Sequence, residues 1–109
     1  MQTKTDIIGM LNMVVSNEKG YRLSTDGSIT EYKFDGESYD IQKIKDLCNF
    51  DYIELVYLPN DIIMIVDEEG LLKSKPYNFV ASIIYQAAYD DKSLGIVGDA
   101  ILCHTSRVN

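Results

Sequence analysis

Residues 52–66 read YIELVYLPNDIIMIV, two runs rich in β-branched and aromatic side chains that are separated by Pro-Asn-Asp. Such runs are typical of strands, and the residues between them favour a turn, so the stretch predicts a hairpin. The second run, Ile62 to Val66, is apolar at every position. Because successive side chains of a strand point to opposite faces, both of its faces must be covered, which predicts an interior strand of a sheet.

Downstream of this hairpin, the sequence predicts a turn, a helix and a last strand. Asp67-Glu68-Glu69-Gly70 favours a turn, after which Leu71-Leu72-Lys73 can pair briefly before Pro76 stops a strand. Asn78 is a typical helix cap. Apolar residues at three- and four-residue spacing then predict one buried helical face, Val80, Ile83, Ile84, Ala87 and Ala88, opposite Ser82, Tyr85 and Gln86. The segment Gly95 to Cys103 is apolar enough to form a strand.

Upstream, the sequence predicts a second hairpin and two helices. Extended segments at 21–23 and 29–34 flank an Asp26-Gly27 turn. Ser38 opens a helix whose apolar side is Ile41, Ile44, Leu47 and Cys48, and Thr5 caps a helix with apolar positions Ile7, Met10, Leu11 and Val14. We therefore expect one α+β domain over residues 1–109, a small antiparallel sheet packed by two or three helices.

The length and composition agree with one folded domain. The chain has 109 residues, of which 46% are hydrophobic and 25% charged, an ordinary globular composition that excludes intrinsic disorder. No run approaches the ~20 apolar residues of a membrane span, and the start of the chain lacks a signal cleavage site. We therefore expect a cytoplasmic protein that does not bind membranes.

The charge is unevenly distributed. The 17 acids and 10 bases give a net charge of −7, which disfavours direct binding of nucleic acid. Residues 46–69 hold seven acids and no base: Asp46, Asp51, Glu54, Asp61, Asp67, Glu68 and Glu69. This segment also contains Tyr52 and Tyr57, and tyrosine is favoured at interfaces. The pattern indicates either a solvated face, with residues 67–69 in a solvated turn, or a docking surface for a basic partner.

Other motifs predict little chemistry. Cys48 and Cys103 are expected to be buried thiols, and one histidine beside them cannot complete a zinc site. Cys103 and His104 are adjacent in a predicted strand and so point to opposite faces, which argues against a nucleophile and base pair. The acids 67–69 lack the spacing of a calcium loop. We expect no catalytic residue, no metal and no cofactor.

Several turns and caps between residues 34 and 103 match a known pattern: Asp35-Gly36, Tyr52-Ile53, Leu58-Pro59-Asn60-Asp61, Glu68-Glu69-Gly70, Asn78 and Ile96-Val97-Gly98. In these the chain resembles the domain of unknown function DUF3846, a small family of phages and mobile elements. Asn49-Phe50-Asp51 departs from the family's glycine pair, and residues 1–30 fall outside the resemblance. Turns and caps indicate a shared fold, so the resemblance implies a phage or mobile-element accessory protein in the cytoplasm of the bacterial host, and no reaction.

Two functions follow as hypotheses. In the first, the acids of residues 46–69, with Tyr52 and Tyr57, engage a basic host protein such as a nuclease, and the chain is a non-enzymatic inhibitor of host defence, similar in role to an anti-CRISPR protein. In the second, the chain is a homo-oligomer that sequesters a small nucleotide signal at a helix start, using Lys73, Lys75, Tyr77 and Asn78.

Overall fold

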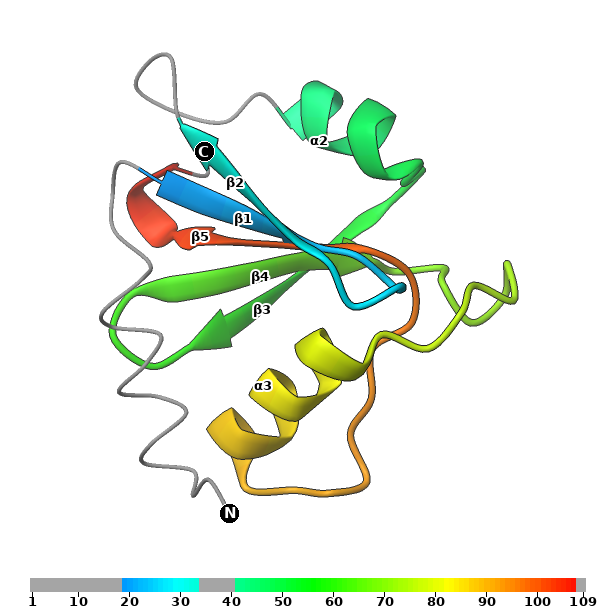
Figure 1. Cartoon of the computed structure of the whole chain (residues 1–109), viewed down its shortest axis with the longest axis vertical. Coiled ribbons are helices and arrows are strands. Elements are labelled where there is room, and N and C mark those ends of the chain that lie inside the picture. Colours follow the sequence, from blue (N-terminus) through cyan, green and yellow to red (C-terminus); the bar gives the residue numbers. More distant parts are fainter. Residues whose placement is uncertain (1–18, 34–40, 108–109) are drawn as a thin grey trace.

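The computed structural model describes residues 19–33 and 41–107, which form a five-stranded antiparallel sheet with a helix on each face (Figure 1). The elements in chain order are β1 (Lys19–Leu23), β2 (Ile29–Lys33), α2 (Ile41–Cys48), β3 (Ile53–Leu58), β4 (Ile62–Asp67), α3 (Phe79–Tyr89), β5 (Ala100–His104) and the 3-10 turn η1 (Thr105–Arg107). The helix expected after Thr5 and the cap expected at Ser38 lie outside the described residues. No helix in the described segments is long and apolar enough to cross a membrane.

The sheet joins two hairpins through the last strand. Its order is β2-β1-β5-β4-β3, so the predicted hairpins β1–β2 and β3–β4 flank β5. β1 pairs with β5 from Tyr21↔Leu102 to Leu23↔Ala100, and β4 pairs with β5 from Ile62↔His104 to Ile65↔Ile101. The prediction that Ile62 to Val66 is an interior strand is confirmed, because every residue of β4 is buried.

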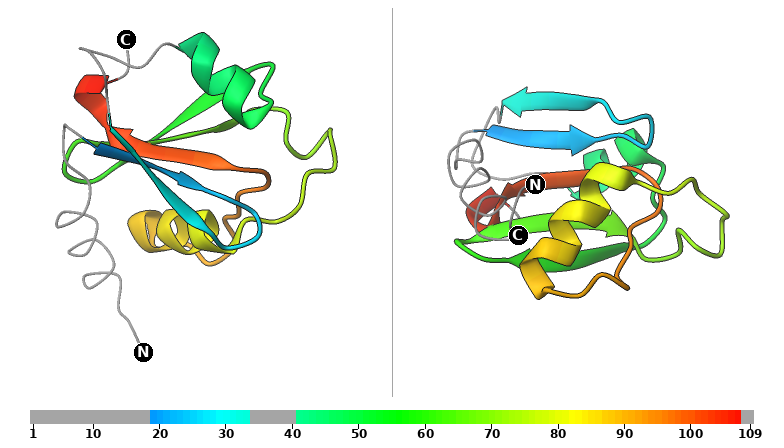
Figure 2. Two further views of the ribbon diagram at one scale, coloured as in Figure 1. Left: turned by 45° about the horizontal axis from the view of Figure 1, so that its top comes forward. Right: turned by 60° about the horizontal axis from the view of Figure 1, so that its bottom comes forward.

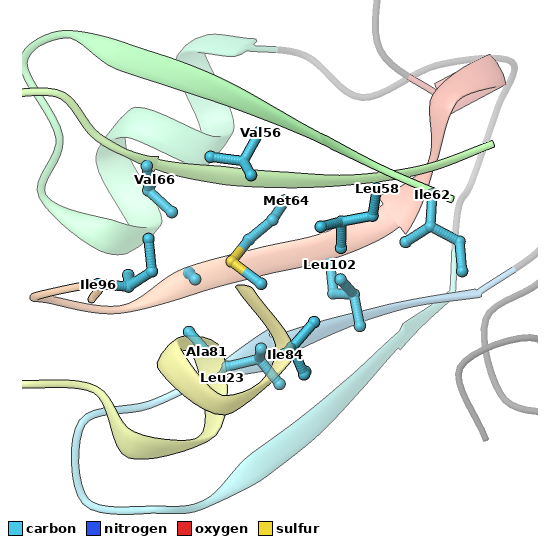
Figure 3. Packing of buried hydrophobic residues seen from close by; sticks show 11 residues of the cluster. Leu23, Val56, Leu58, Ile62, Met64, Val66, Ala81, Ile84, Ile96 and Leu102 are labelled. Carbon is cyan, nitrogen blue, oxygen red and sulfur yellow. The ribbon is translucent and has the colours of Figure 1, made fainter. Parts of the chain in front are cut away.

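Two hydrophobic cores lie on opposite faces of the sheet. On the α3 face, Met64 and Leu102 of the strands pack with Ala81 and Ile84 of the helix (Figure 3). On the α2 face, Ile63, Ile65, Ile101 and Cys103 pack with Ile44 and Cys48. The alternation of side chains along each strand therefore fills two layers, as the doubly apolar run of β4 requires.

The buried side of α3 differs from the predicted one. Asn78 caps the helix, as expected, by accepting a hydrogen bond from the Ala81 N–H. Ile83, however, was expected in the core and is 50% exposed, whereas Ser82 was expected outside and is buried. Ser82 is buried because its hydroxyl accepts the Ile96 N–H at 2.8 Å, so the chain before β5 lies over this side of the helix.

Two further expectations about strands were wrong. Residues 71–74 form turns instead of a brief strand, since the backbone folds back on itself through the bond from the Lys73 N–H to the Glu69 carbonyl. The last strand begins at Ala100 and not at Gly95. Gly98 explains the late start, because its φ of +79° interrupts an extended chain.

Candidate acidic binding site

The structure divides the acids of residues 46–69 among three places. Five of them, Asp51, Glu54, Asp67, Glu68 and Glu69, meet where β3 begins and β4 ends, because Ile53 pairs with Asp67. Asp61 lies in the turn at the other end of this hairpin, a distance of about 20 Å along a six-residue strand. Asp46 is an exposed residue of α2. The site is therefore smaller than the segment that the sequence indicated.

Asp67 is a buried carboxylate, which corrects the expectation of a fully solvated turn. Its Oδ2 lies 3.1 Å from Lys73 Nζ and 2.6 Å from Lys75 Nζ, and its Oδ1 accepts the Glu69 N–H at 2.9 Å. Burial raises the pKa of Asp67, but the hydrogen bonds from Lys75, the Glu69 N–H and Lys73 outweigh it and lower this pKa below 3.8. Asp67 is thus an ionised residue that holds the following turn against the end of β4.

The same two lysines tie down the segment between α2 and β3. Lys73 Nζ lies 2.9 Å from an Asp51 oxygen, and this hydrogen bond is the first cause of a raised pKa of Lys73. Lys75 donates to the Asn49 carbonyl at 3.0 Å, and its amine lies 4.8 Å from the centre of the Phe50 ring. Two carboxylates, on Asp51 and Asp67, therefore cancel the charges of Lys73 and Lys75.

The three remaining carboxylates of the cluster have no ion-pair partner among the side chains that the structure describes. There, Glu54, Glu68 and Glu69 form no ion pair with a lysine or an arginine. The side chains of Glu54 and Glu68 are exposed, and that of Glu69 is half-buried. With the lysine pairs neutralised, these side chains give the site a local charge of three negative units, and we call them the acidic triad.

Two members of the acidic triad line a cleft. This cleft has a volume of about 290 Å³ and lies between the open end of the β3–β4 hairpin and the segment that leads to β5. It is lined by Glu54, Val66, Asp67, Glu68, Leu71, Tyr85, Ser93, Leu94, Gly95, Ile96 and Val97. Burial and then the charge of Glu54 raise the pKa of Tyr85. An anionic rim over apolar walls can accommodate a cationic head with a hydrocarbon stem.

The two tyrosines of the acidic segment are separated. Tyr52 is 61% exposed, and its carbonyl accepts the Glu68 N–H at 3.0 Å, so it adjoins the acidic triad. Tyr57 is also exposed but lies near the far end of β3, where it pairs with Ile63. Because Ile63 belongs to the α2-side core, Tyr57 lies on the other face of the sheet. Of these two tyrosines, only Tyr52 adjoins the acidic triad.

The residues of the alternative nucleotide site do not converge on a ligand. Lys73 and Lys75 contact Asp67 instead of the start of α3. Asn78 is completely buried, and its two amide hydrogens are donated to the Leu23 and Gly98 carbonyls. Tyr77 is 42% exposed and stacks edge-on against Phe79. The cations that this hypothesis needs are therefore already bound to carboxylates.

The two thiols belong to the core on the α2 face, and the histidine follows one of them at the end of β5. Cys48 and Cys103 are buried and unpaired, and burial, the main cause, raises the pKa of Cys48 to about 11 and that of Cys103 to about 12. His104 lies beyond the buried Cys103, and its Nδ1 contacts the Ser106 hydroxyl at 2.8 Å. Within the described part of the chain, no three metal-ligating side chains come together.

Two polar contacts were missed by the sequence analysis. The Asp99 carboxylate accepts hydrogen bonds from the Arg22 guanidinium and from the Thr25 N–H, and so fixes the β1–β2 hairpin to the start of β5. The pairing of Asp67 with Lys73 and Lys75 was also missed. The sequence did contain an indication of that pairing. Asp67 directly follows five apolar residues of a strand, so its carboxylate lies at the edge of the core and needs a cationic partner.

Comparison with known proteins identifies one match. A family model described as a domain of unknown function, DUF3846, matches residues 13–108. No curated protein and no solved structure matches the chain. The matched span starts before β1, so the expectation that the whole of residues 1–30 lies outside the family was wrong for residues 13–30.

Proposed function

The chain belongs to the DUF3846 family, and from the charge distribution on its fold we propose that it is a non-enzymatic protein that binds and blocks a basic site on a host defence factor. The acidic triad carries this proposal. Glu54, Glu68 and Glu69 have no cationic partner among the described residues, although two lysines stand close by and neutralise Asp51 and Asp67. Carboxylates left unpaired beside a cleft are suited to a cationic partner.

The partner class follows from electrostatics and from the setting that the family resemblance implies. A concentrated negative field accelerates encounter with a basic protein surface and competes with nucleic acid for it. A nuclease that acts against phages or mobile elements presents such a surface. Tyr52, exposed next to Glu68, adds an aromatic ring of the kind enriched at interfaces.

The experiment compares two charge-matched double variants of the full chain. Wild-type protein, Glu54→Gln/Glu68→Gln and the control Asp61→Asn/Asp90→Asn are immobilised and exposed to a lysate of the bacterial host. The control removes the same charge at two exposed positions whose φ angles, +61° and +52°, asparagine adopts readily. We expect a basic protein to be captured by the wild type and the control and to be lost from the Gln variant.

The captured protein is then purified and its Kd measured at low and high salt. The Gln variant should weaken binding at least tenfold, about 1.4 kcal/mol, and the wild-type Kd should rise steeply with salt. Equal binding by all three proteins, or a Kd that is indifferent to salt, would contradict an electrostatic interface at the acidic triad.

A further inference from the structure

Helix α3 has an apolar surface on the side that faces away from the sheet. Its sequence, FVASIIYQAAY, contains no charged residue, although a quarter of the chain is charged. Ala81 and Ile84 face the sheet and are buried, whereas Phe79 is 69% and Ile83 50% exposed. Phe79 and Ile83 are four residues apart, so they are neighbours on the helix surface. A helix that covers a sheet ordinarily has a polar outer side, and α3 does not.

The apolar surface continues beyond the helix in two directions. The Tyr77 ring contacts the Phe79 ring edge-on, with 4.9 Å between their centres. Ile29 of β2 is 58% exposed and pairs with Leu23, whose carbonyl accepts from the Asn78 cap of α3. Because paired residues point to the same face and Leu23 belongs to the α3-side core, Ile29 lies on the side of α3.

Ile29 is exposed because α3 does not extend over the β1–β2 hairpin (Figure 2). α3 lies across β3, β4 and β5, while the β1–β2 hairpin extends beside it (Figure 2). We call the surface formed by Ile29, Tyr77, Phe79 and Ile83 the outer apolar face.

We propose that the outer apolar face is where two copies of the chain pair about a two-fold axis. Each copy has a net charge of −7, so two copies repel one another over most of their surface. A helix without formal charge offers the approach with the least repulsion. A two-fold axis also makes one patch serve both partners, so no second surface is needed.

The exposed area indicates how strong the pairing can be. A standard interface buries about 800 Å² on each partner. The four side chains of the outer apolar face are 42–69% exposed and together offer roughly 400 Å² of accessible surface, about half of that area. Polar groups around them would have to supply the other half of the interface. We therefore expect a dimer with a Kd in the micromolar range.

The test is the mass of the full chain by sedimentation equilibrium from ~1 to ~200 µM. Wild type should rise from the monomer mass to twice that mass. Phe79→Glu and Ile83→Glu should weaken the Kd at least tenfold, so that the rise in mass moves to at least tenfold higher concentration or leaves the range. Phe79→Glu is especially informative, because an acid in the first turn favours the helix, so loss of pairing cannot result from melting of α3.

The matched control is Tyr57→Glu, which adds the same charge at an aromatic residue that is 62% exposed on the other side of the sheet. It should dimerise as the wild type does. At ~1 µM, below the expected dimer concentration, Tm by circular dichroism should be the same for the wild type and all three variants. A wild type that is monomeric at every concentration would overturn the proposal. Dissociation of the Tyr57 variant to the same extent as the other two variants would also overturn it. A large fall in Tm of the Phe79 and Ile83 variants at this low concentration would do the same, because it would mean that residues of the same chain cover the outer apolar face.

Discussion

The buried carboxylate of Asp67 connects the stability of the protein to pH. It receives hydrogen bonds from Lys73, Lys75 and the Glu69 N–H, and its side chain is inaccessible to solvent. Burial raises its pKa, but these partners lower it overall. A carboxyl group whose pKa is lower in the folded state stabilises the fold above its unfolded pKa, and this contribution is lost as pH falls through the folded pKa.

Asp67→Asn should therefore destabilise the protein in a pH-dependent way. The variant leaves Lys73 and Lys75 without their shared partner, and we expect a loss of about 2 kcal/mol in the free energy of unfolding at pH 7. The deficit should shrink as pH falls below the ordinary pKa of an aspartate, about 4, and through the lower pKa of folded Asp67, because the wild type then loses the charge that the variant lacks. Urea unfolding between pH 3 and 7 measures it, with Asp61→Asn as the exposed control. A deficit that is the same at every pH would show that the charge of Asp67 does not stabilise the fold.

Asn78 shows how far sequence reasoning reaches at a single residue. Its role as a cap could be predicted, because the bond to the Ala81 N–H joins residues three positions apart. Its two other hydrogen bonds join it to Leu23 and Gly98, which are 55 and 20 positions away. No local pattern encodes these partners. The same limit explains why the Arg22 and Asp99 contact was missed.

At the scale of an element, α3 shows why a helix can be predicted while its buried side cannot. Apolar spacing identified the helix, and its cap fixed where it begins. Because apolar residues lie on more than one side of the helix, however, more than one stripe has the correct spacing. Contact with Ile96 decided the orientation by giving the Ser82 hydroxyl a partner, and Ile83 was left outside. Tertiary contacts, and not periodicity, selected the buried face.

A pair of alanine variants tests this assignment of the helix sides. Ser82→Ala removes the acceptor of the buried Ile96 N–H and should lower the free energy of unfolding by about 1–2 kcal/mol. Ile83→Ala removes a larger, half-exposed side chain and should cost less than about 0.5 kcal/mol. Urea unfolding at ~1 µM protein, below the expected dimer concentration, measures both. If Ile83→Ala lowered the free energy of unfolding more than Ser82→Ala, Ile83 would belong to the buried side of α3, as the sequence predicted.

At the scale of the whole molecule, the two hairpins were predictable and their arrangement was not. Each hairpin depends on a local turn, Asp26-Gly27 in one and Pro59-Asn60-Asp61 in the other. Their separation by β5 depends on pairs such as Tyr21↔Leu102, which are distant in sequence. The acidic site shows the same division. Its charge was visible in the composition, whereas the neutralisation of Asp51 and Asp67 required the fold.

A molecule with a net charge of −7 that concentrates unpaired carboxylates in one place carries a cost in stability. Glu54, Glu68 and Glu69 repel one another, and the two lysines close by are already paired with Asp51 and Asp67. Glu68→Gln should therefore raise the free energy of unfolding by about 0.5 kcal/mol at low ionic strength, and this gain should fade in high salt, which screens exposed charges. Asp61→Asn, about 20 Å away along the hairpin, should show a smaller salt-dependent gain.

Urea unfolding at low and at ~0.5 M salt measures both gains. A wild type that is less stable than Glu68→Gln, yet binds its basic partner more tightly, would show that the acidic triad is retained for binding at the expense of stability, as functional sites often are. If Glu68→Gln is instead less stable than the wild type at low salt, the glutamate has a stabilising contact of its own, and the acidic triad then has to be reinterpreted as part of the structural network around Asp67.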